Sequence, residues 1–243
     1  MKAFLILEDG TVFTGTSIGS AREAVSEIVF NTSMTGYLEV LTDPSYAGQA
    51  VVMTYPLIGN YGICYDDMES ARPWPDGFIV RELSRLPSNF RCEDTIQNFL
   101  EKNDIPGISG IDTRALTKIL REKGTMNGMI TTREYEDLEE PISRIKAYSV
   151  KGVVKATSCK EKYVLEPEDS KLQEPVRRVA LLDLGAKKNI ARSLVERGCE
   201  VTVYPCDTPA EEILASCPDG IMLSNGPGDP KENTEIIDRK SVV

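Results

Sequence analysis

The pattern that decides the fold class lies in residues 178–205, which read RVALLDLGAKKNIARSLVERGCEVTVYP. The first six of these, 178–183, form a short apolar run that predicts a buried strand. Residues 187–197 follow with apolar side chains on one helical face, and Gly198 is placed as the C-terminal stop of that helix. A second strand is expected at 201–204, so the stretch predicts one strand–helix–strand unit.

The same alternation continues downstream of this unit. Residues 208–211, Thr-Pro-Ala-Glu, have the form of a capping box with proline at the first helical position, which predicts a short helix through Ser216. Residues 218–220 then turn the chain into a third strand at 221–224. Strands and helices that alternate at this spacing indicate an α/β fold with a doubly wound parallel sheet.

The part of the chain that precedes these elements predicts a separate, mixed α/β domain. Phe4–Leu7 and Thr11–Phe13 flank an Asp9-Gly10 turn, which predicts a hairpin. Two helices are expected later, at about 93–102 and 112–123, because apolar residues recur there on one helical face. Strands come first and helices later, without strict alternation, which favours a mixed α/β domain over a second parallel sheet.

Composition sets the domain boundaries that we expect. An N-terminal domain is assigned to 1–150, and a partial parallel-sheet domain to 177–237. The intervening segment, 151–176, is charged and weakly periodic, so it is expected to connect the two domains, with a short strand near 163–165.

The last six residues, 238–243, stand apart from this pattern. They read Asp-Arg-Lys-Ser-Val-Val and carry no apolar helical face. They also match the translation of a common sequencing adapter, so we expect them to be a non-native tail.

The charge balance argues against two classes of partner. The chain has 28 Lys and Arg against 38 Asp and Glu, a net charge of −10. Binding to nucleic acid requires a surplus of basic residues on one face, and binding to an anionic membrane surface has a similar requirement. The sequence also shows neither a secretory signal pattern nor a long apolar span. We therefore expect a cytoplasmic protein that binds neither nucleic acid nor membrane.

The content of cysteine and histidine restricts the chemistry available. The chain has no histidine, which excludes Ser-His-Asp, Cys-His and HExxH mechanisms within these residues. Its cysteines form no CxxC pair and fit no zinc-ligand spacing, so they are expected to be reduced core residues. None occupies a Gly-x-Cys-x-Gly elbow, and Cys206 alone is expected near the ligand edge of the sheet. The six are Cys64, Cys92, Cys159, Cys199, Cys206 and Cys217.

The loop at 224–230, Ser-Asn-Gly-Pro-Gly-Asp-Pro, is the strongest candidate binding element. It leaves the carboxyl end of the third predicted strand, where open α/β sheets bind ligands. Gly226 and Gly228 lack a β-carbon, so their backbone N–H groups can approach a ligand closely. An ordinary Gly/Pro turn explains the loop equally well. Ser45, within Asp43-Pro-Ser45, is by itself most simply a turn hydroxyl.

Several longer motifs, in order and without gaps, resemble the small subunit of carbamoyl-phosphate synthase. The similarity extends to about residue 237 and is highly specific. The motifs are FNTSMTGY at 30–37, LTDPSY at 41–46, TYPLIGNYG at 54–62, SNF at 88–90, GIDTRALT at 110–117, LREKG at 120–124, LGAKKNI at 184–190 and LSNGPGDP at 223–230.

The resemblance implies the first part of a class I glutamine amidotransferase domain after the N-terminal domain. In the family, a cysteine attacks the amide of L-glutamine, and the released ammonia passes to a large subunit. That subunit uses ATP, magnesium and bicarbonate to make carbamoyl phosphate for arginine and pyrimidine biosynthesis. The resemblance therefore implies a heterodimer, with no cofactor in this chain. It also implies that Ser45, Gly226 and Gly228 contact glutamine, and that the Gly226 amide helps to hold the oxyanion.

The sequence departs from the family at the catalytic residues. The family's nucleophile elbow and the His and Glu of its triad come later in the family's sequence than the motifs matched here. We therefore expect a truncated form without catalytic residues, inactive by itself. A non-catalytic module that docks on the large subunit is the alternative. Another class I amidotransferase is disfavoured, because the motifs at 30–62 lie outside the domain that such enzymes share.

Overall fold

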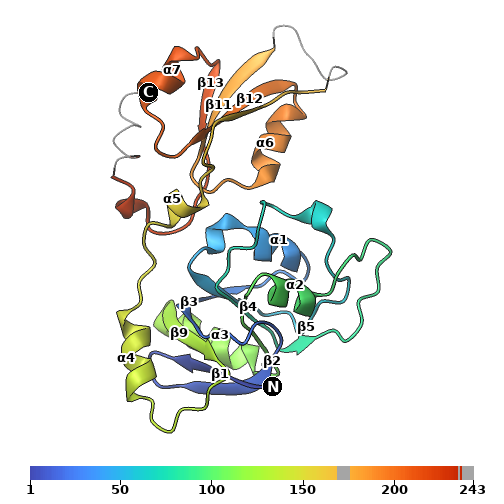
Figure 1. Cartoon of the computed structure of the whole chain (residues 1–243), viewed down its shortest axis with the longest axis vertical. Helices are drawn as coiled ribbons and strands as arrows, with labels where there is room; N and C mark the ends of the chain where they lie inside the picture. Colours follow the sequence, from blue (N-terminus) through green and yellow to red (C-terminus); the bar gives the residue numbers. More distant parts are fainter. Residues whose placement is uncertain (169–175, 235, 237–243) are drawn as a thin grey trace. The chain divides into compact units, whose positions relative to one another are not determined.

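The computed structural model describes residues 1–168, 176–234 and 236. The chain divides into two compact units, Met1–Val150 and Lys151–Val243, here called unit 1 and unit 2 (Figure 1). The expected tail at 238–243 lies outside the described residues. In the described part of the chain, no helix is both long and apolar enough to cross a membrane.

Unit 1 is built on a closed barrel of seven strands in the order β1-β2-β8-β6-β4-β3-β9. The hairpin expected at its start is confirmed, since β1 pairs antiparallel with β2 and Leu5 lies opposite Phe13. Parallel pairs join β3 to β4, β4 to β6, and β6 to β8. Closure of the barrel was not predicted from the sequence. The strands are β1 Lys2–Leu7, β2 Val12–Ser17, β3 Ala24–Asn31, β4 Gln49–Met53, β6 Gly77–Ile79, β8 Gly107–Ser109 and β9 Met126–Thr131; β5 Leu57–Ile58 and β7 Glu82–Leu83 form a separate parallel pair.

Four α-helices of unit 1 accompany the barrel: α1 Tyr37–Thr42, α2 Ile96–Lys102, α3 Thr113–Lys123 and α4 Glu139–Ala147. The expected helix at 112–123 is confirmed as α3, whose N-cap Asp112 accepts the Ala115 N–H at 3.0 Å. The helix expected from 93 begins only at Ile96, because the backbone of 93 and 94 pairs with Ile63 instead. Two 3₁₀ turns, η1 Pro44–Tyr46 and η2 Tyr65–Asp67, complete the unit's helical elements.

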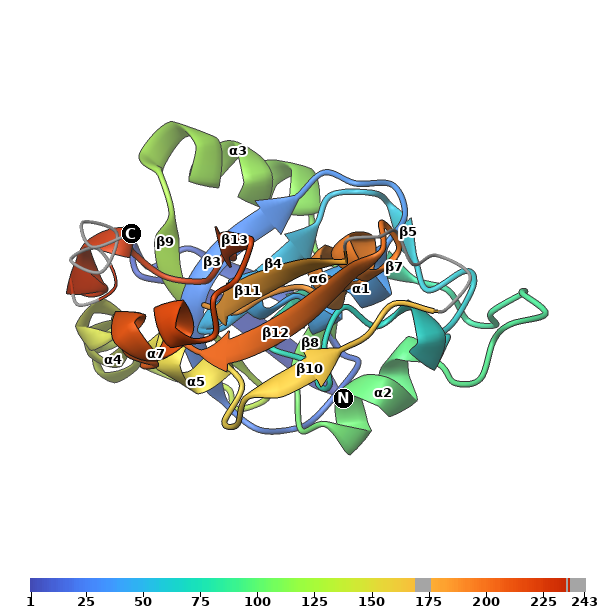
Figure 2. The same ribbon diagram turned by 90° about the horizontal axis from the view of Figure 1, so that it is seen from above.

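The central strand β4 shows how unit 1 is packed. Its alternate residues enter two different apolar clusters: Val51 and Met53 pack with residues of α1 and α2, whereas Ala50 and Val52 pack with residues of α3. Figure 2 shows α3 lying alongside β3 and β4. The barrel strand is therefore covered on both faces, as its almost continuous apolar sequence requires.

In its described residues, unit 2 contains a four-stranded sheet in the order β10-β12-β11-β13. The three strands expected in its second part are confirmed, and β11 runs parallel to both β12 and β13. Its described elements are α5 Val153–Thr157, β10 Tyr163–Leu165, β11 Arg177–Asp183, α6 Lys188–Val195, β12 Cys199–Pro205, α7 Ala210–Ala215, β13 Gly220–Leu223 and the 3₁₀ turn η4 Pro230–Glu232. The segment 151–176 thus contributes α5 and β10 to this unit, and β10 pairs antiparallel with β12.

Helices cover both faces of this sheet, on opposite sides of its strands in Figure 1. Ala180 and Leu182 of β11 pack with Ile213 of α7, whereas Leu181 packs with Ala191 of α6. One local expectation was wrong: Pro209, not Thr208, is the N-cap of α7, and it makes no side-chain capping hydrogen bond. The helix itself forms where it was expected.

Candidate functional site

Two loops meet at the carboxyl-terminal edge of the unit 2 sheet. The loop at 184–187 follows β11, and the loop at 224–229 follows β13. These strands are parallel neighbours, with Leu182 opposite Leu223, so both loops leave the sheet at the same edge. This is the edge at which open α/β sheets bind ligands.

Ser224 joins the two loops. Its side chain accepts the Leu184 N–H at 2.9 Å and donates to the Asn225 carbonyl at 2.7 Å, while its own N–H donates to the Leu182 carbonyl at 3.1 Å. Only 8% of Ser224 is exposed. A buried hydroxyl that bonds to both loops fixes their separation, because breaking either bond would leave a polar group without a partner.

Asp183 holds the loop at 184–187 in place through hydrogen bonds. One carboxylate oxygen accepts the N–H groups of Gly185 and Ala186, at 2.9 and 2.7 Å. The other accepts the Cys159 N–H at 2.7 Å. Three backbone donors compensate a carboxylate that is buried. From the sequence, Asp183 was predicted only as the end of a strand, although a charged residue that closes a buried apolar strand is itself a signal of such a role.

The glycines at this edge are required by the backbone. A β-carbon on Gly226 would overlap the carbonyl oxygen of Leu184, so only glycine allows the two loops to come this close. Gly228 has a φ of +76° and Gly185 a φ of +109°, both in the region that favours glycine. A β-carbon on Gly185 would also lie 2.8 Å from Pro227 Cδ.

Gly226 and Gly228 line one cavity of about 190 Å³. The structure therefore brings these two predicted site residues together. The remaining lining residues are Val154, Leu184, Ser224, Pro227, Pro230, Asn233 and Ile236. A second hollow of about 460 Å³ shares Val154, Pro227, Gly228 and Asn233 with it, and is completed by Lys151, Gly152, Val153 and Glu232. Ligand sites are concave in this way, with a few convergent polar groups.

Ser45 lies in unit 1, on η1, and is described within that unit. Its N–H donates to the Asp43 side chain at 2.9 Å, so Asp43-Pro-Ser45 forms the turn that its sequence indicates. Its contact with glutamine stays a prediction.

Two thiols of unit 2, those of Cys159 and Cys206, are poorly suited to nucleophilic attack. Burial, together with the neighbouring Asp183 carboxylate, raises the pKa of Cys159 to about 12, which keeps that thiol protonated. Cys206 is buried, and its N–H donates to Ser158 Oγ at 2.9 Å. Among the described residues, no group of His, Cys, Asp or Glu is placed to hold a metal ion.

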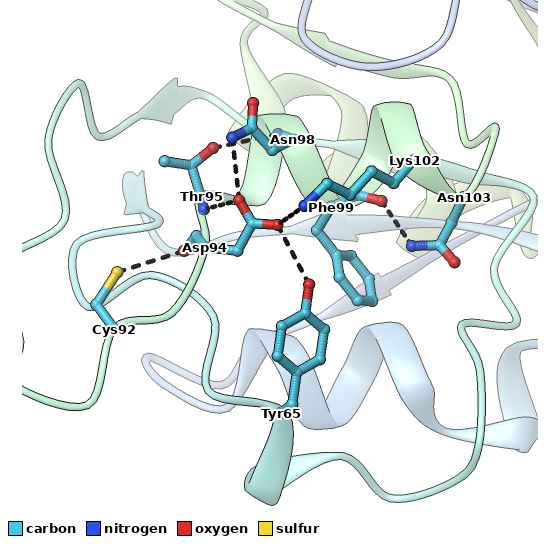
Figure 3. Close-up of polar contacts among 8 residues, drawn as sticks. All are labelled: Tyr65, Cys92, Asp94, Thr95, Asn98, Phe99, Lys102 and Asn103. Carbon is cyan, nitrogen blue, oxygen red and sulfur yellow. Dashed lines mark hydrogen bonds and ion pairs between the residues drawn. The ribbon is translucent and has the colours of Figure 1, made fainter.

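Unit 1 contains a second polar cluster, around Asp94 (Figure 3). One Asp94 oxygen accepts from the Thr95 N–H and from Asn98 Nδ2, at 2.8 and 3.0 Å. The other accepts from Lys102 Nζ at 2.6 Å and from the Tyr65 hydroxyl at 3.2 Å. These partners belong to α2 and η2, so the carboxylate connects the two elements. With all its acceptor sites engaged inside the protein, the cluster is structural.

Comparisons with known proteins match both units. The family model described as "Carbamoyl-phosphate synthase small chain, CPSase domain" matches residues 5–130, and "Glutamine amidotransferase class-I" matches residues 180–241. A carbamoyl phosphate synthase small chain from Clostridium perfringens is 52% identical, over 100% of this chain and 68% of the relative.

Two further relatives with the same name extend this similarity. The protein from Syntrophotalea carbinolica is 48% identical, over 95% of this chain and 64% of its own length. The protein from Oceanobacillus iheyensis is 50% identical, over 98% of this chain and 63% of its own length. The chain therefore spans about two thirds of the length of the relatives that it matches.

Proposed function

Because this chain belongs to the carbamoyl-phosphate synthase small-chain family, we propose that it is the glutamine-hydrolysing subunit of such an enzyme. In this role it releases ammonia from L-glutamine for a large subunit. The large subunit then makes carbamoyl phosphate from bicarbonate and ATP, with magnesium, for arginine and pyrimidine biosynthesis. The two subunits form a heterodimer in the cytoplasm, and this chain itself holds no cofactor.

Unit 2 is proposed to be the first part of a doubly wound class I glutamine amidotransferase domain. The order of its sheet supports this, because β12 and β13 lie on opposite sides of β11 and all three are parallel. Helices on both faces add to the support. Reversal of the strand order at β11 is the feature that creates a ligand crevice in doubly wound sheets.

The observation that carries the proposal is the close approach of Gly226 to Leu184 at this crevice. We propose that Gly226 and Gly228 line the glutamine site, with Ser45 contributing from unit 1. The Gly226 N–H would stabilise the negative charge that develops on the amide oxygen during attack. Backbone donors that are held in place before the reaction stabilise such charge without reorganising. Ser224 and Asp183 supply that rigidity through the bonds described above.

The docking module remains a second candidate, on two specific observations. The 243 residues contain no histidine, and the Cys159 thiol is kept protonated by its raised pKa. We therefore propose that residues 1–243 alone release no glutamate from glutamine, with or without a large subunit. Turnover that is abolished by Cys206→Ser would contradict this.

A chimera tests the proposed function. Residues 1–237 would replace the matching part of the Clostridium perfringens small chain, and the product would be assayed with its large subunit. We expect carbamoyl phosphate synthesis that depends on glutamine. Gly226→Ala keeps the backbone N–H, but its β-carbon would overlap the Leu184 carbonyl oxygen and displace that donor. It should therefore lower the glutamine-dependent rate by about 10²-fold, the usual effect of a misplaced oxyanion donor, while synthesis from added ammonia is retained.

Gly220→Ala is the matched control. A β-carbon at Gly220 meets nothing within 4 Å, and its φ is not positive, so this variant should keep its full activity. A chimera that folds, binds the large subunit and uses only ammonia would support the docking module instead.

A further inference from the structure

Unit 1 contains a hollow that combines hydroxyl and cationic groups. It is remote in sequence from the loops at 184–187 and 224–229. Thr32 follows β3 directly, and Thr54 follows β4 directly. The two strands are parallel, with Asn31 opposite Met53, so both threonines emerge at the same strand ends. Helix α3 packs beside these strands, as Figure 2 shows. Its side chains also line the hollow.

The wall that α3 presents is cationic. Arg114, Lys118 and Arg121 recur at intervals of four and three residues, which places them on one helical face over about 10 Å. The buried side of the same helix carries Leu116 and Leu120. The three cations are thus held in line by a helix that is anchored to the core.

These charges are poorly compensated within the protein. Lys118 lies 3.8 Å from Glu122, and both side chains are exposed. Neither guanidinium group, Arg114 nor Arg121, has an ion-pair or hydrogen-bond partner among the described residues. Like charges at this spacing repel each other, and an anion placed between them would relieve that repulsion.

The hollow has the size of a small-molecule site, about 660 Å³. It is lined by Thr32, Thr54, Arg114, Thr117, Lys118, Arg121 and Glu122. Three cations face one carboxylate, and the hydroxyls add further donors. We propose that this hollow binds a phosphate-bearing small molecule. Guanidinium groups pair with phosphate through two parallel hydrogen bonds, and the charge of a phosphate suits more than one cation.

Pyrophosphate is the probe for this site. Calorimetric titration of the 243-residue protein at low salt should show saturable binding. Arg114→Gln and Arg121→Gln should each weaken it by about tenfold, the effect of losing a charge-assisted hydrogen bond. Arg85→Gln is the matched control, because Arg85 is exposed in the same unit and lies outside the hollow. The affinity of this variant for pyrophosphate should change less than about twofold.

A second variant separates hydroxyl donation from charge. Thr32→Val/Thr54→Val keeps every cation and should weaken binding by about threefold or more, with amide NMR shifts on pyrophosphate addition confined to the hollow. The absence of saturable binding, equal weakening by Arg85→Gln, or no weakening in any of these variants would overturn the proposal. So would binding of an acidic peptide, but not of pyrophosphate, at the same residues.

Discussion

The two units differ in whether their sheets have unpaired edge strands. Unit 1 closes its sheet into a barrel, so each barrel strand has a partner on both sides. Unit 2 leaves its sheet open, and in the described residues β13 pairs only with β11, while β10 pairs only with β12. Met222 and Leu223 of β13 are 36% and 38% exposed, whereas the apolar residues of β4 are fully buried. The loops at 184–187 and 224–229 therefore extend from the unit whose sheet edge is open.

The largest expected consequence is a difference in hydrogen exchange. Amides of β4 should exchange at least about a thousandfold more slowly than those of β13, because exchange in a doubly paired, buried strand requires near-global unfolding. Exchange measured by NMR on the 243-residue protein tests this. The central strand β11 provides the internal control and should be slower than β13. Equal protection of β4 and β13 would remove the contrast between the units.

Replacing one leucine in each unit with alanine measures the same contrast as a change in the free energy of unfolding. Leu5 of β1 is fully buried, and Leu5→Ala should lower the free energy of unfolding of unit 1 by about 2–5 kcal/mol. Leu223→Ala, at a 38% exposed position, should cost unit 2 under about 1 kcal/mol. The single tryptophan, Trp74, reports unit 1 in urea titrations, and exchange of β11 amides reports unit 2. A similar loss of unfolding free energy in both variants would contradict the expected difference between the two units.

What the sequence could predict also differs between the units. The parallel strands of unit 2 follow from local periodicity, and they were found. Barrel closure in unit 1 depends on pairs such as Thr16 with Ser109, which lie far apart in sequence, and no local pattern encodes it. The start of α2 was placed too early because the backbone of residues 93 and 94 pairs with Ile63, which is distant in sequence.

The candidate site was predictable only in part, for the same reason. Gly226 and Gly228 flank Pro227 just after a strand, so their place at the sheet edge could be predicted. The role of Asp183 depends on the Cys159 N–H, which a separate part of the chain supplies. A contact of that kind is invisible until the fold is known.

The Asp94 cluster of unit 1 should have a smaller effect. Asp94→Asn should lower the free energy of unfolding by about 1–2 kcal/mol at pH 7, because hydrogen bonds to a carboxylate with 7% side-chain exposure lose their charge assistance. Asp66→Asn, at an exposed position in η2, is the control and should be nearly neutral. Trp74 fluorescence in urea measures both variants.

The pH dependence of the free energy of unfolding gives a second test of the role of Asp94. Burial raises the pKa of Asp94, but the hydrogen bonds from Lys102 and its other neighbours outweigh burial, so the pKa lies below its ordinary value. A depressed pKa contributes stability above the unfolded-state pKa near 4, and this is lost as the pH falls through the folded-state value. The gap between wild type and Asp94→Asn should therefore narrow below about pH 4. A gap that is constant down to pH 2 would mean that the charge contributes nothing.

The smallest expected change in stability concerns the open edge itself. Met222→Lys places a charge on β13, the strand that pairs only with β11 in the described residues, and should alter the free energy of unfolding by no more than about 0.5 kcal/mol. Exposed apolar edge strands associate with one another, and lysine on an edge blocks that association. Sedimentation velocity at increasing concentration should therefore show less self-association in this variant than in the wild type. Val12→Lys is the matched control, because Val12 is 40% exposed but belongs to a strand of the closed barrel. If both lysines reduce self-association equally, the net charge of the chain and not the open edge is responsible.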